Sequence, residues 1–246
     1  MHTLARGTVH AITLAALALA GGCTPALAPA PAEPRAAAAE GAPVQACWVE
    51  SRERLGFTAS GLLVRHPQGD VLIDAGNSTA FDEEIDVYHG QHHRWLATFP
   101  GALQPRRSIA EELSRMQVDP AGLRWILPTH SHLDHLGGAL DLPAIPVLMS
   151  DEEAALVRRG AAEVTTEVVP AHAIAVAPRV VPLEFVPEPY EIFDAHADLF
   201  GDGSVVVVPL PGHTAGSVGV FVRKADGRRI FHVGDAVNDR EQIERN

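Results

Sequence analysis

The sequence contains a dense group of potential metal ligands between residues 129 and 138: His130, His132, Asp134 and His135. His130 and His132 are two positions apart, so in an extended segment both imidazoles point to the same side. Gly137 and Gly138 follow directly and let the backbone turn sharply. Imidazole and carboxylate ligands without cysteine suit zinc, or iron or manganese, better than a thiolate site. Because ligands on a loop leave coordination positions open, the pattern predicts a catalytic rather than a structural metal site.

The alternative interpretation of this group is a histidine-rich surface loop without a ligand. The residues directly before it argue against that, since residues 123–128 read as a short buried strand. A strand that ends at the first histidine supplies the structural context that a motif needs to carry weight. We therefore expect the metal site at the end of this strand.

Other predicted strands also end close to a polar side chain. Hydrophobic runs predict strands at 61–66, 71–74, 145–149, 205–208, 218–222 and 229–233. Asp74 ends one of these runs, His213 lies in the turn after 205–208, and Asp235 follows the last. Strand ends that converge on one edge of a sheet preorganise a metal site. We expect these three side chains to lie near His130.

Two helices are predicted from a serine that is followed three residues later by a glutamate, the pattern of a capping box. Ser108 and Glu111 begin a helix that extends to about residue 116. Ser150 and Glu153 begin a second, which extends to about residue 159. The segment 161–186 is rich in Val, Ala and Pro and its structure stays open.

Length and charge narrow the class of protein. The 246 residues, 46% of them hydrophobic, suit one large α/β domain with a real core. The formal net charge is −12, and basic residues form only a few arginine pairs. Nucleic-acid binding requires clustered Lys and Arg, so we expect a small-molecule substrate and no nucleic-acid partner.

With only two cysteines, no disulfide framework is expected. The oligomeric state stays open.

The first residues read as an export signal. Residues 11–20 are apolar except for Thr13, a run too short to span a bilayer. Residues 19–23 (LAGGC) resemble a bacterial lipoprotein signal, which predicts a signal peptide at 1–22 and a lipidated Cys23 that attaches the protein to a membrane. The alternative is an ordinary secretory signal cleaved near residues 26–28, which Pro29 disfavours. Either way we expect an exported protein, periplasmic or membrane-anchored.

A tether is predicted between this signal and the folded domain. Residues 24–43 are almost entirely Ala, Pro, Glu and Gly and have no periodicity that would bury a face. We therefore predict three parts: the signal at 1–22, a tether at 23–43, and a folded domain at 44–246.

Four segments of the folded domain resemble the metallo-β-lactamase superfamily. They are 72–76 (LIDAG), 129–135 (THSHLDH), 211–214 (PGHT) and 233–235 (VGD). The second is highly specific, and the others gain weight from their order. The resemblance covers most of 44–246 and implies an α/β fold, a four-layer αβ/βα sandwich. In such a fold two β-sheets pack face to face with helices outside, and a dinuclear metal site lies at one edge.

The resemblance also implies which residues hold two Zn²⁺ ions. One ion would be held by His130, His132 and His213. The other would be held by Asp134 and His135, with Asp235 bridging the two. Asp74 would stay outside the ligand set and orient the histidine loop by hydrogen bonds.

One ligand of the family pattern has no counterpart in the sequence. The family supplies a last histidine to the second metal from a strand after the bridging aspartate, but no histidine follows Asp235. We therefore expect the domain to be C-terminally incomplete, without its closing strand and helix, and the second metal site to be incomplete. The sheet edge at Phe231 and Val233 would then be exposed.

The implied chemistry is hydrolysis of an ester-type bond. A dinuclear site lowers the pKa of water towards about 7 and holds the resulting hydroxide against a carbonyl. Asp134 would act as the catalytic residue that passes a proton to the departing alkoxide. Asp235, residues 81–88 and the spacing from Asp74 to His130 look most like the lactonase group, which implies an N-acyl homoserine lactone-like substrate. The alternatives are a thioesterase of glyoxalase II type, a β-lactamase-like hydrolase, or an inactive remnant that only binds metal.

The segment 77–101 adds aromatic residues and further histidines. Tyr88 and Phe99 bound a stretch that we expect to line a pocket for an acyl chain. His89, His92 and His93 are expected to be solvated, because their spacing fits no standard metal site.

Overall fold

The computed structural model describes residues 44–54, 57–97 and 107–237, all of which belong to one compact unit, Pro34–Asn246. The predicted signal peptide at 1–22, Cys23, the tether up to residue 43 and Phe99 lie outside the described residues. No helix among the described residues combines the length and the apolar character needed to cross a membrane.

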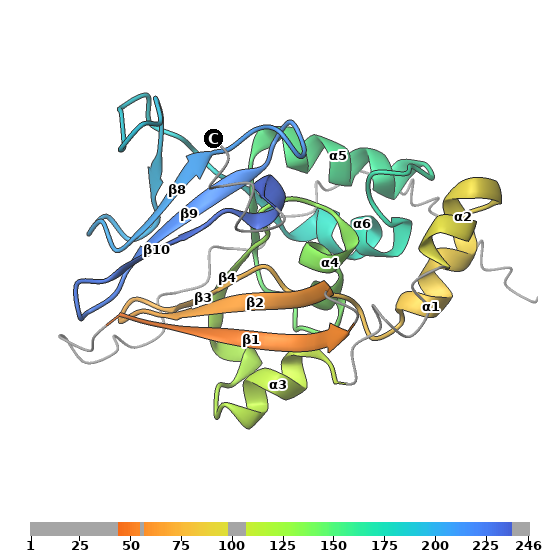
Figure 1. Cartoon of the computed structure of the whole chain (residues 1–246), viewed down its shortest axis with the longest axis horizontal. Helices are drawn as coiled ribbons and strands as arrows, with labels where there is room; N and C mark the ends of the chain where they lie inside the picture. The colour runs from red at the N-terminus through yellow and green to blue at the C-terminus, as the bar shows by residue number, and fades with distance from the viewer. Residues whose placement is uncertain (1–43, 55–56, 98–106, 238–246) are drawn as a thin grey trace, which may run out of the picture. The chain divides into compact units, whose positions relative to one another are not determined.

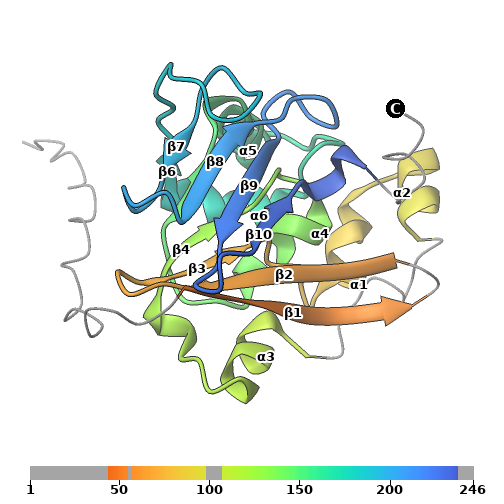
Figure 2. The ribbon, with the colours of Figure 1, turned by 60° about the vertical axis from the view of Figure 1, so that its left-hand side comes forward.

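Two β-sheets form the centre of this unit (Figures 1 and 2). The larger has the strand order β1 (Gln45–Arg54), β2 (Phe57–Arg65), β3 (Asp70–Ile73), β4 (Leu123–Leu127), β5 (Val147–Met149) and β6 (Val180–Pro182). Strands β1 to β3 are antiparallel, and β3 to β6 are parallel. The smaller sheet is antiparallel, in the order β10 (Arg229–His232), β9 (Val218–Arg223), β8 (Val205–Pro209) and β7 (Ala197–Asp198).

Residues 61–64 of strand β2 are buried on both faces. Leu62 and Val64 pack against Val205 and Val220 of the smaller sheet, whereas Leu63 between them packs on the helical side. Side chains alternate across a strand, so a strand covered on both faces needs apolar residues at every position. This is why the predicted strand at 61–66 reads as a nearly continuous hydrophobic run.

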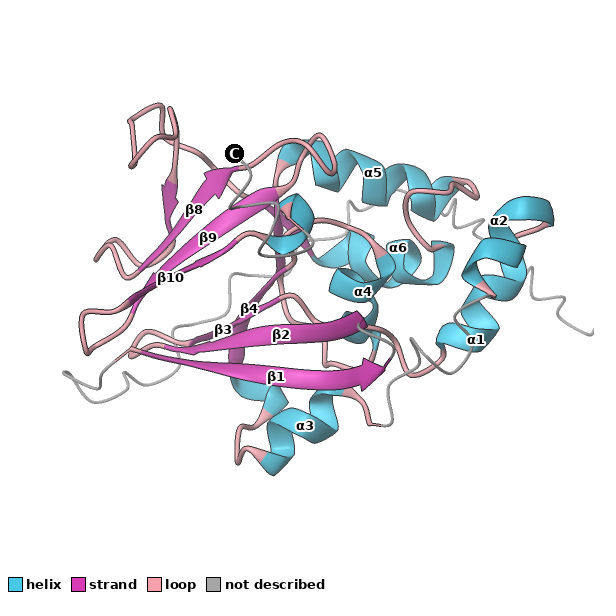
Figure 3. Cartoon of the chain, viewed as in Figure 1, coloured by secondary structure: helices cyan, strands magenta, loops and turns pink. Residues whose placement is uncertain are grey.

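Helices cover the face of the larger sheet that points away from the smaller one (Figure 3). They are α3 (Ile109–Arg115), α5 (Asp151–Ala162) and α6 (Pro170–Val176). Two short helices, α1 (Phe81–Glu84) and α2 (Gly90–Leu96), follow β3, and α4 (Leu133–Leu136) follows β4. The two sheets and this helical layer confirm the predicted α/β sandwich. The open segment 161–186 contains α6 and β6.

The two predicted capping boxes differ in outcome. At α3 the box is complete, because Ser108 accepts from the Glu111 amide and donates its own amide to the Glu111 carboxylate. At α5 only half of it forms. Ser150 accepts from the Glu153 amide at 3.3 Å, but Oε2 of Glu153 accepts from the backbone amide of Ser131 at 2.7 Å instead. The prediction of a second capping box was therefore wrong for Glu153, whose carboxylate finds donors elsewhere.

The outer face of the smaller sheet carries aromatic side chains. The rings of Phe221 and Phe231 stack with their centroids 3.9 Å apart. In the described part of the chain, loop residues Tyr190 and Phe193 rather than a helix pack against these rings. Phe231 lies on the edge strand β10 with 38% of its surface exposed, as predicted, whereas Val233 is half-buried.

Candidate metal centre

The ends of β3 and β4 bring Asp74 and the histidine motif together. These neighbouring parallel strands end at the same edge, where the Asp74 amide donates to the Leu127 carbonyl at 3.1 Å. One residue later, the Ala75 amide donates to the His135 carbonyl at 2.8 Å. The fit is tight, since a Cβ added to Gly138 would lie 2.0 Å from the Ala75 carbonyl oxygen. Glycine at this position therefore lets the motif pack directly on the end of β3.

The smaller sheet contributes His213 and Asp235 to the same edge. His213 lies in the turn between β8 and β9, and the Val218 amide at the start of β9 donates to the Thr129 carbonyl at 2.9 Å. Asp235 lies in a short 3₁₀ turn, Gly234–Ala236, directly after β10. Gly234 has φ +52° and packs against Thr129. Thr129 is thus the point where both predicted ligand segments of the smaller sheet meet the histidine loop.

A first group of ligand atoms is formed by the imidazoles of His130, His132 and His213. One ring nitrogen of each lies within 4.8 Å of the others. The rings are edge to face, with centroids 4.5 to 4.7 Å apart, and Nε2 of His213 lies 2.8 Å from Nδ1 of His132. Nε2 of His130 is buried and has no hydrogen-bond partner. A buried acceptor without a partner is costly, so these three nitrogens fit a shared cation.

A second group consists of His130, His135 and Asp235. Asp235 belongs to this second group and also faces the first: one oxygen is 3.1 Å from Nε2 of His135, and the other is 3.6 Å from Nε2 of His213. This placement suits a carboxylate that serves two ions. Asp134 lies beside the second group, 3.7 Å from Nε2 of His135, but belongs to neither group. Its roles as ligand and proton carrier stay predictions.

The charges at the centre are strongly coupled. Burial, followed by the charges of His135 and His132, lowers the pKa of His130 to about 2. Burial and the charge of His213 also lower the pKa of His132. The hydrogen bond from His135 lowers the pKa of Asp235 to about 2. His130 and His132 are therefore neutral and Asp235 is ionised at neutral pH, as metal binding requires, whereas His135 would have to release a proton to bind a metal.

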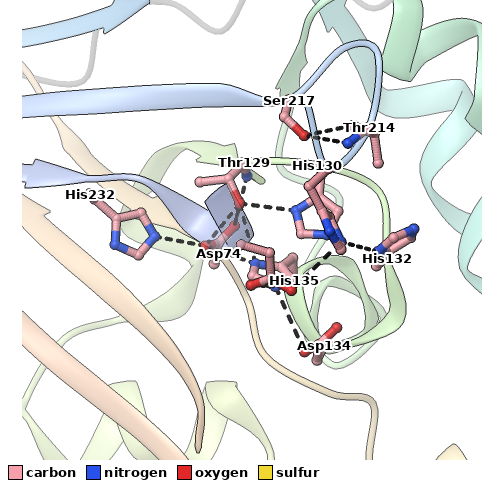
Figure 4. Close-up of polar contacts among 11 residues, drawn as sticks. Asp74, Thr129, His130, His132, Asp134, His135, Thr214, Ser217 and His232 are labelled. Carbon is pink, nitrogen blue, oxygen red and sulfur yellow. Dashed lines mark hydrogen bonds and ion pairs between the residues drawn. The ribbon is translucent and has the colours of Figure 1, made fainter. Parts of the chain in front are cut away.

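Asp74 forms several hydrogen bonds next to the predicted ligands (Figure 4). Its Oδ1 accepts from the Thr129 amide at 2.7 Å, while its Oδ2 lies 3.0 Å from Nδ1 of His135 and 2.8 Å from Nε2 of His232. Burial alone would raise the pKa of Asp74, but the charge of His135 and the hydrogen bonds from both histidines hold it well below its usual range. Burial is the largest single influence on His135 and lowers its pKa, but the charge of Asp74 and the hydrogen bonds to Asp235 and Asp74 together raise that pKa well above its usual value.

Sequence reasoning missed three residues that contact the centre. Nε2 of His232 lies 2.8 Å from Oδ2 of Asp74, and its position three residues before Asp235 was the available signal. The hydroxyl of Thr129 lies 3.0 Å from Oδ1 of Asp74 and 3.2 Å from Nδ1 of His135. Glu153 was interpreted as a helix cap, although it follows a strand that ends at the same edge of the sheet.

A cavity of about 340 Å³ opens beside the second group. Trp48 and Phe231 give it apolar walls, and Asp134, His135 and Asp235 form its polar end. A volume of this size suits a small ligand held by a few polar groups in an apolar surround.

The predicted pocket in the segment 77–101 is only partly described. Tyr88 is 5% exposed and packs with Phe81, Ile85 and Val169, so it does not line an open pocket. That part of the prediction was wrong, because the apolar ring is used for packing. His89 is exposed as expected, and the side chain of His92 lies outside the described residues.

The sequence and the fold are similar to those of known proteins. Residues 54–246 match the family described as the metallo-beta-lactamase superfamily. Two proteins named "Probable metallo-hydrolase", from Mycobacterium tuberculosis and Mycobacterium bovis, are each 27% identical over 219 residues, which cover 84% of this chain and 66% of theirs. The chain thus spans slightly less than two thirds of the length of these relatives. An N-acyl homoserine lactonase of Rhizobium johnstonii is 28% identical over 78 residues, 30% of this chain and 27% of its own.

Two solved structures share the fold. One is an N-acyl homoserine lactone hydrolase with the product N-hexanoyl-L-homoserine at its catalytic metal centre, with TM-score 0.57 and 19% identity over 82% of this chain and 77% of that one. The other is a B. thuringiensis protein with N-decanoyl-L-homoserine at its active site, with TM-score 0.54 and 18% identity over the same shares, 82% and 77%. At such low identity, these likenesses show the fold alone.

Proposed function

Because this chain belongs to the metallo-beta-lactamase superfamily, we propose that it is a metal-dependent hydrolase that opens a lactone, of the N-acyl homoserine type. One observation carries the proposal: two groups of ligand atoms share His130, whose buried Nε2 has no partner, and Asp235 of the second group also faces the first. When bound, two zinc ions supply a Lewis acid that lowers the pKa of water and polarises a carbonyl.

The residues of the chain have separate tasks in this reaction. His130, His132 and His213 would hold one ion, His135 with Asp134 beside it would hold the other, and Asp235 would serve both. Asp74 keeps the ring of His135 in one orientation and one tautomer. As water adds to the acyl carbon, Asp134 accepts one of its protons; the ring C–O bond then breaks, and Asp134 passes that proton to the leaving oxygen.

The choice of lactone has its own support. The chain resembles a lactonase over 78 residues, and both structural neighbours hold an N-acyl homoserine, one at its catalytic metal centre and the other at its active site. The apolar walls formed by Trp48 and Phe231 next to Asp134 suit a substrate with a polar ring and an acyl chain.

Ring opening is tested on the zinc-loaded protein with N-hexanoyl homoserine lactone, by titrating the acid released. We expect the wild type to hydrolyse the lactone and His132→Ala to hydrolyse it more slowly, by roughly 100-fold or more. Losing a residue that only supports a metal ligand costs about 10- to 100-fold, and losing a ligand should cost at least as much. His89→Ala, an exposed histidine in neither ligand group, should retain the wild-type rate. Equal rates for His132→Ala and the wild type would sink the proposal. A glutathione thioester and a β-lactam assayed in parallel test the alternative substrates.

The number of bound metals tests whether the chain is an enzyme at all. Two tightly held zinc ions per chain favour the dinuclear hydrolase, and His213→Ala should then lose one of them. One ion or none in the wild type would favour a remnant that only binds metal.

A further inference from the structure

The start of α5 contacts both of the segments that carry the first group of histidines. Glu153, in its first turn, is 2% exposed. Its Oε2 accepts from the Ser131 amide at 2.7 Å, and its Oε1 accepts from the Thr214 hydroxyl. Ser131 lies between His130 and His132, and Thr214 follows His213 directly. One buried carboxylate therefore connects the two histidine segments through the residues next to the ligands.

The turn that carries His213 is packed tightly against the same end of α5. The Ser150 hydroxyl donates to the Gly216 carbonyl at 2.8 Å. A Cβ on Gly216 would lie 2.5 Å from Oγ of Ser150 and 2.7 Å from the Glu153 amide, so the turn has no room to move closer. Oγ1 of Thr214 also lies 2.7 Å from Oγ of Ser217, which holds that oxygen in place within the turn. The Thr214 hydroxyl is thus held where the carboxylate can accept from it.

The carboxylate of Glu153 is buried, and its hydrogen bonds go to the two histidine segments. Taking a carboxylate out of water is unfavourable unless its oxygens accept hydrogen bonds, and here each oxygen has one donor. Neither donor belongs to the cap of α5, although Glu153 occupies the position of a reciprocal cap. The matching residue of α3, Glu111, does form its cap and is exposed. The side chain of Glu153 therefore serves the loops rather than the helix.

We propose that Glu153 is a positioning residue of the metal centre, holding His130 and His132 at the distance from His213 that one shared ion requires. The proposal rests on the proposed function for the presence of that ion, but not on the lactone. It acts through Ser131 and Thr214 and not on the imidazoles themselves. Glu153 thus has the role of an outer partner that fixes ligand geometry.

The test measures zinc affinity of the whole chain by competition with a chelator, together with the visible absorption of the Co²⁺-loaded protein. Glu153→Ala removes both hydrogen bonds and should lower zinc affinity by about 10-fold or more. Glu153→Gln should restore most of it, because its carbonyl still accepts from Ser131 and the Thr214 hydroxyl can turn to accept from its amide. Glu111→Ala removes the equivalent residue of α3 and should leave zinc affinity and the Co²⁺ spectrum unchanged.

A second variant tests whether Glu153→Ala lowers zinc affinity only because it destabilises the fold. Thr214→Val cuts one of the two bonds without altering α5 and should lower zinc affinity by several-fold. Combined with Glu153→Ala it should add nothing further, since both changes break the same connection. Unchanged zinc affinity and Co²⁺ spectrum in Glu153→Ala would overturn the inference, as would additive losses in the double variant. A wild type that binds zinc without opening lactones would instead overturn only the proposed substrate.

Discussion

Oδ2 of Asp74 lies 3.0 Å from Nδ1 of His135, and the other nitrogen of that ring faces Asp235 at 3.1 Å. A buried carboxylate thus fixes the orientation of a predicted ligand from behind. Asp74 also has φ 56°, in the left-handed region that asparagine tolerates well. Asn at this position therefore removes the charge without straining the backbone.

We predict that Asp74→Asn lowers zinc affinity by about 10- to 100-fold, the usual cost of losing an outer partner of a metal ligand. Chelator competition measures the change. Asp226→Asn, which alters an exposed carboxylate paired with Arg228, is the control and should bind zinc like the wild type. Wild-type affinity in Asp74→Asn would show that the His135 ring needs no support from this carboxylate.

The metal-free protein should lose stability as the pH falls below about 6.5. Burial lowers the pKa of His130 from 6.5 to about 2, so between these values the unfolded chain binds a proton that the folded chain does not. The free energy of unfolding should then fall by up to about 1.4 kcal/mol per pH unit from this residue. The lowered pKa of His132 acts in the same direction, and His135, with its raised pKa, is protonated in both states there.

Urea unfolding between about pH 5 and 6.5 checks this slope. His130→Asn should flatten it, whereas His89→Asn should leave it as in the wild type. An identical slope in His130→Asn would mean that His130 takes up its proton in the folded protein.

Gly138→Ala should destabilise the fold strongly. The added Cβ would lie 2.0 Å from the Ala75 carbonyl oxygen, which is backbone and cannot move aside cheaply. We expect a loss of roughly 3 kcal/mol in the free energy of unfolding, the upper end of overpacking costs. Gly212→Ala, in the turn before His213, has no atom within 4 Å of its added Cβ and should change stability by less than about 1 kcal/mol. Similar urea midpoints for the two variants would refute the close packing.

We propose that Cys23 is the lipidated residue of an exported lipoprotein. Expression in a bacterial host with labelled palmitate should label the wild type and not Cys23→Ala. Cys47→Ala, which changes the other cysteine, should remain labelled. An unlabelled wild type would favour the ordinary secretory signal.

The spacing of ligands and strands was enough to predict the main features of the fold and the centre. The sequence predicted the motif from His130 to His135 because it follows a hydrophobic run. It predicted Asp74, His213 and Asp235 as residues of the site for the same reason. Strands of one sheet share their edges, so residues far apart in sequence were expected at one place, and the structure brings them there.

What the sequence did not reveal depends on side-chain partners that only packing determines. Ser150 and Glu153 match a capping box as well as Ser108 and Glu111 do. The difference is that α5 begins where β5 ends, at the edge that holds the histidines, so Glu153 meets donors that Glu111 never encounters. Tyr88 shows the reverse error, since an aromatic residue in a loop was expected to face a ligand and instead fills a small core.

The position of Asp74 has a consequence for the molecule as a whole. Its carboxylate receives Thr129 from the end of β4 in one sheet and His232 from the end of β10 in the other. The contact between the two sheets and the edge that carries the predicted ligands therefore depend on the same carboxylate. A sequence change that loosens the contact between the two sheets is therefore expected to weaken metal binding even when every predicted ligand is retained.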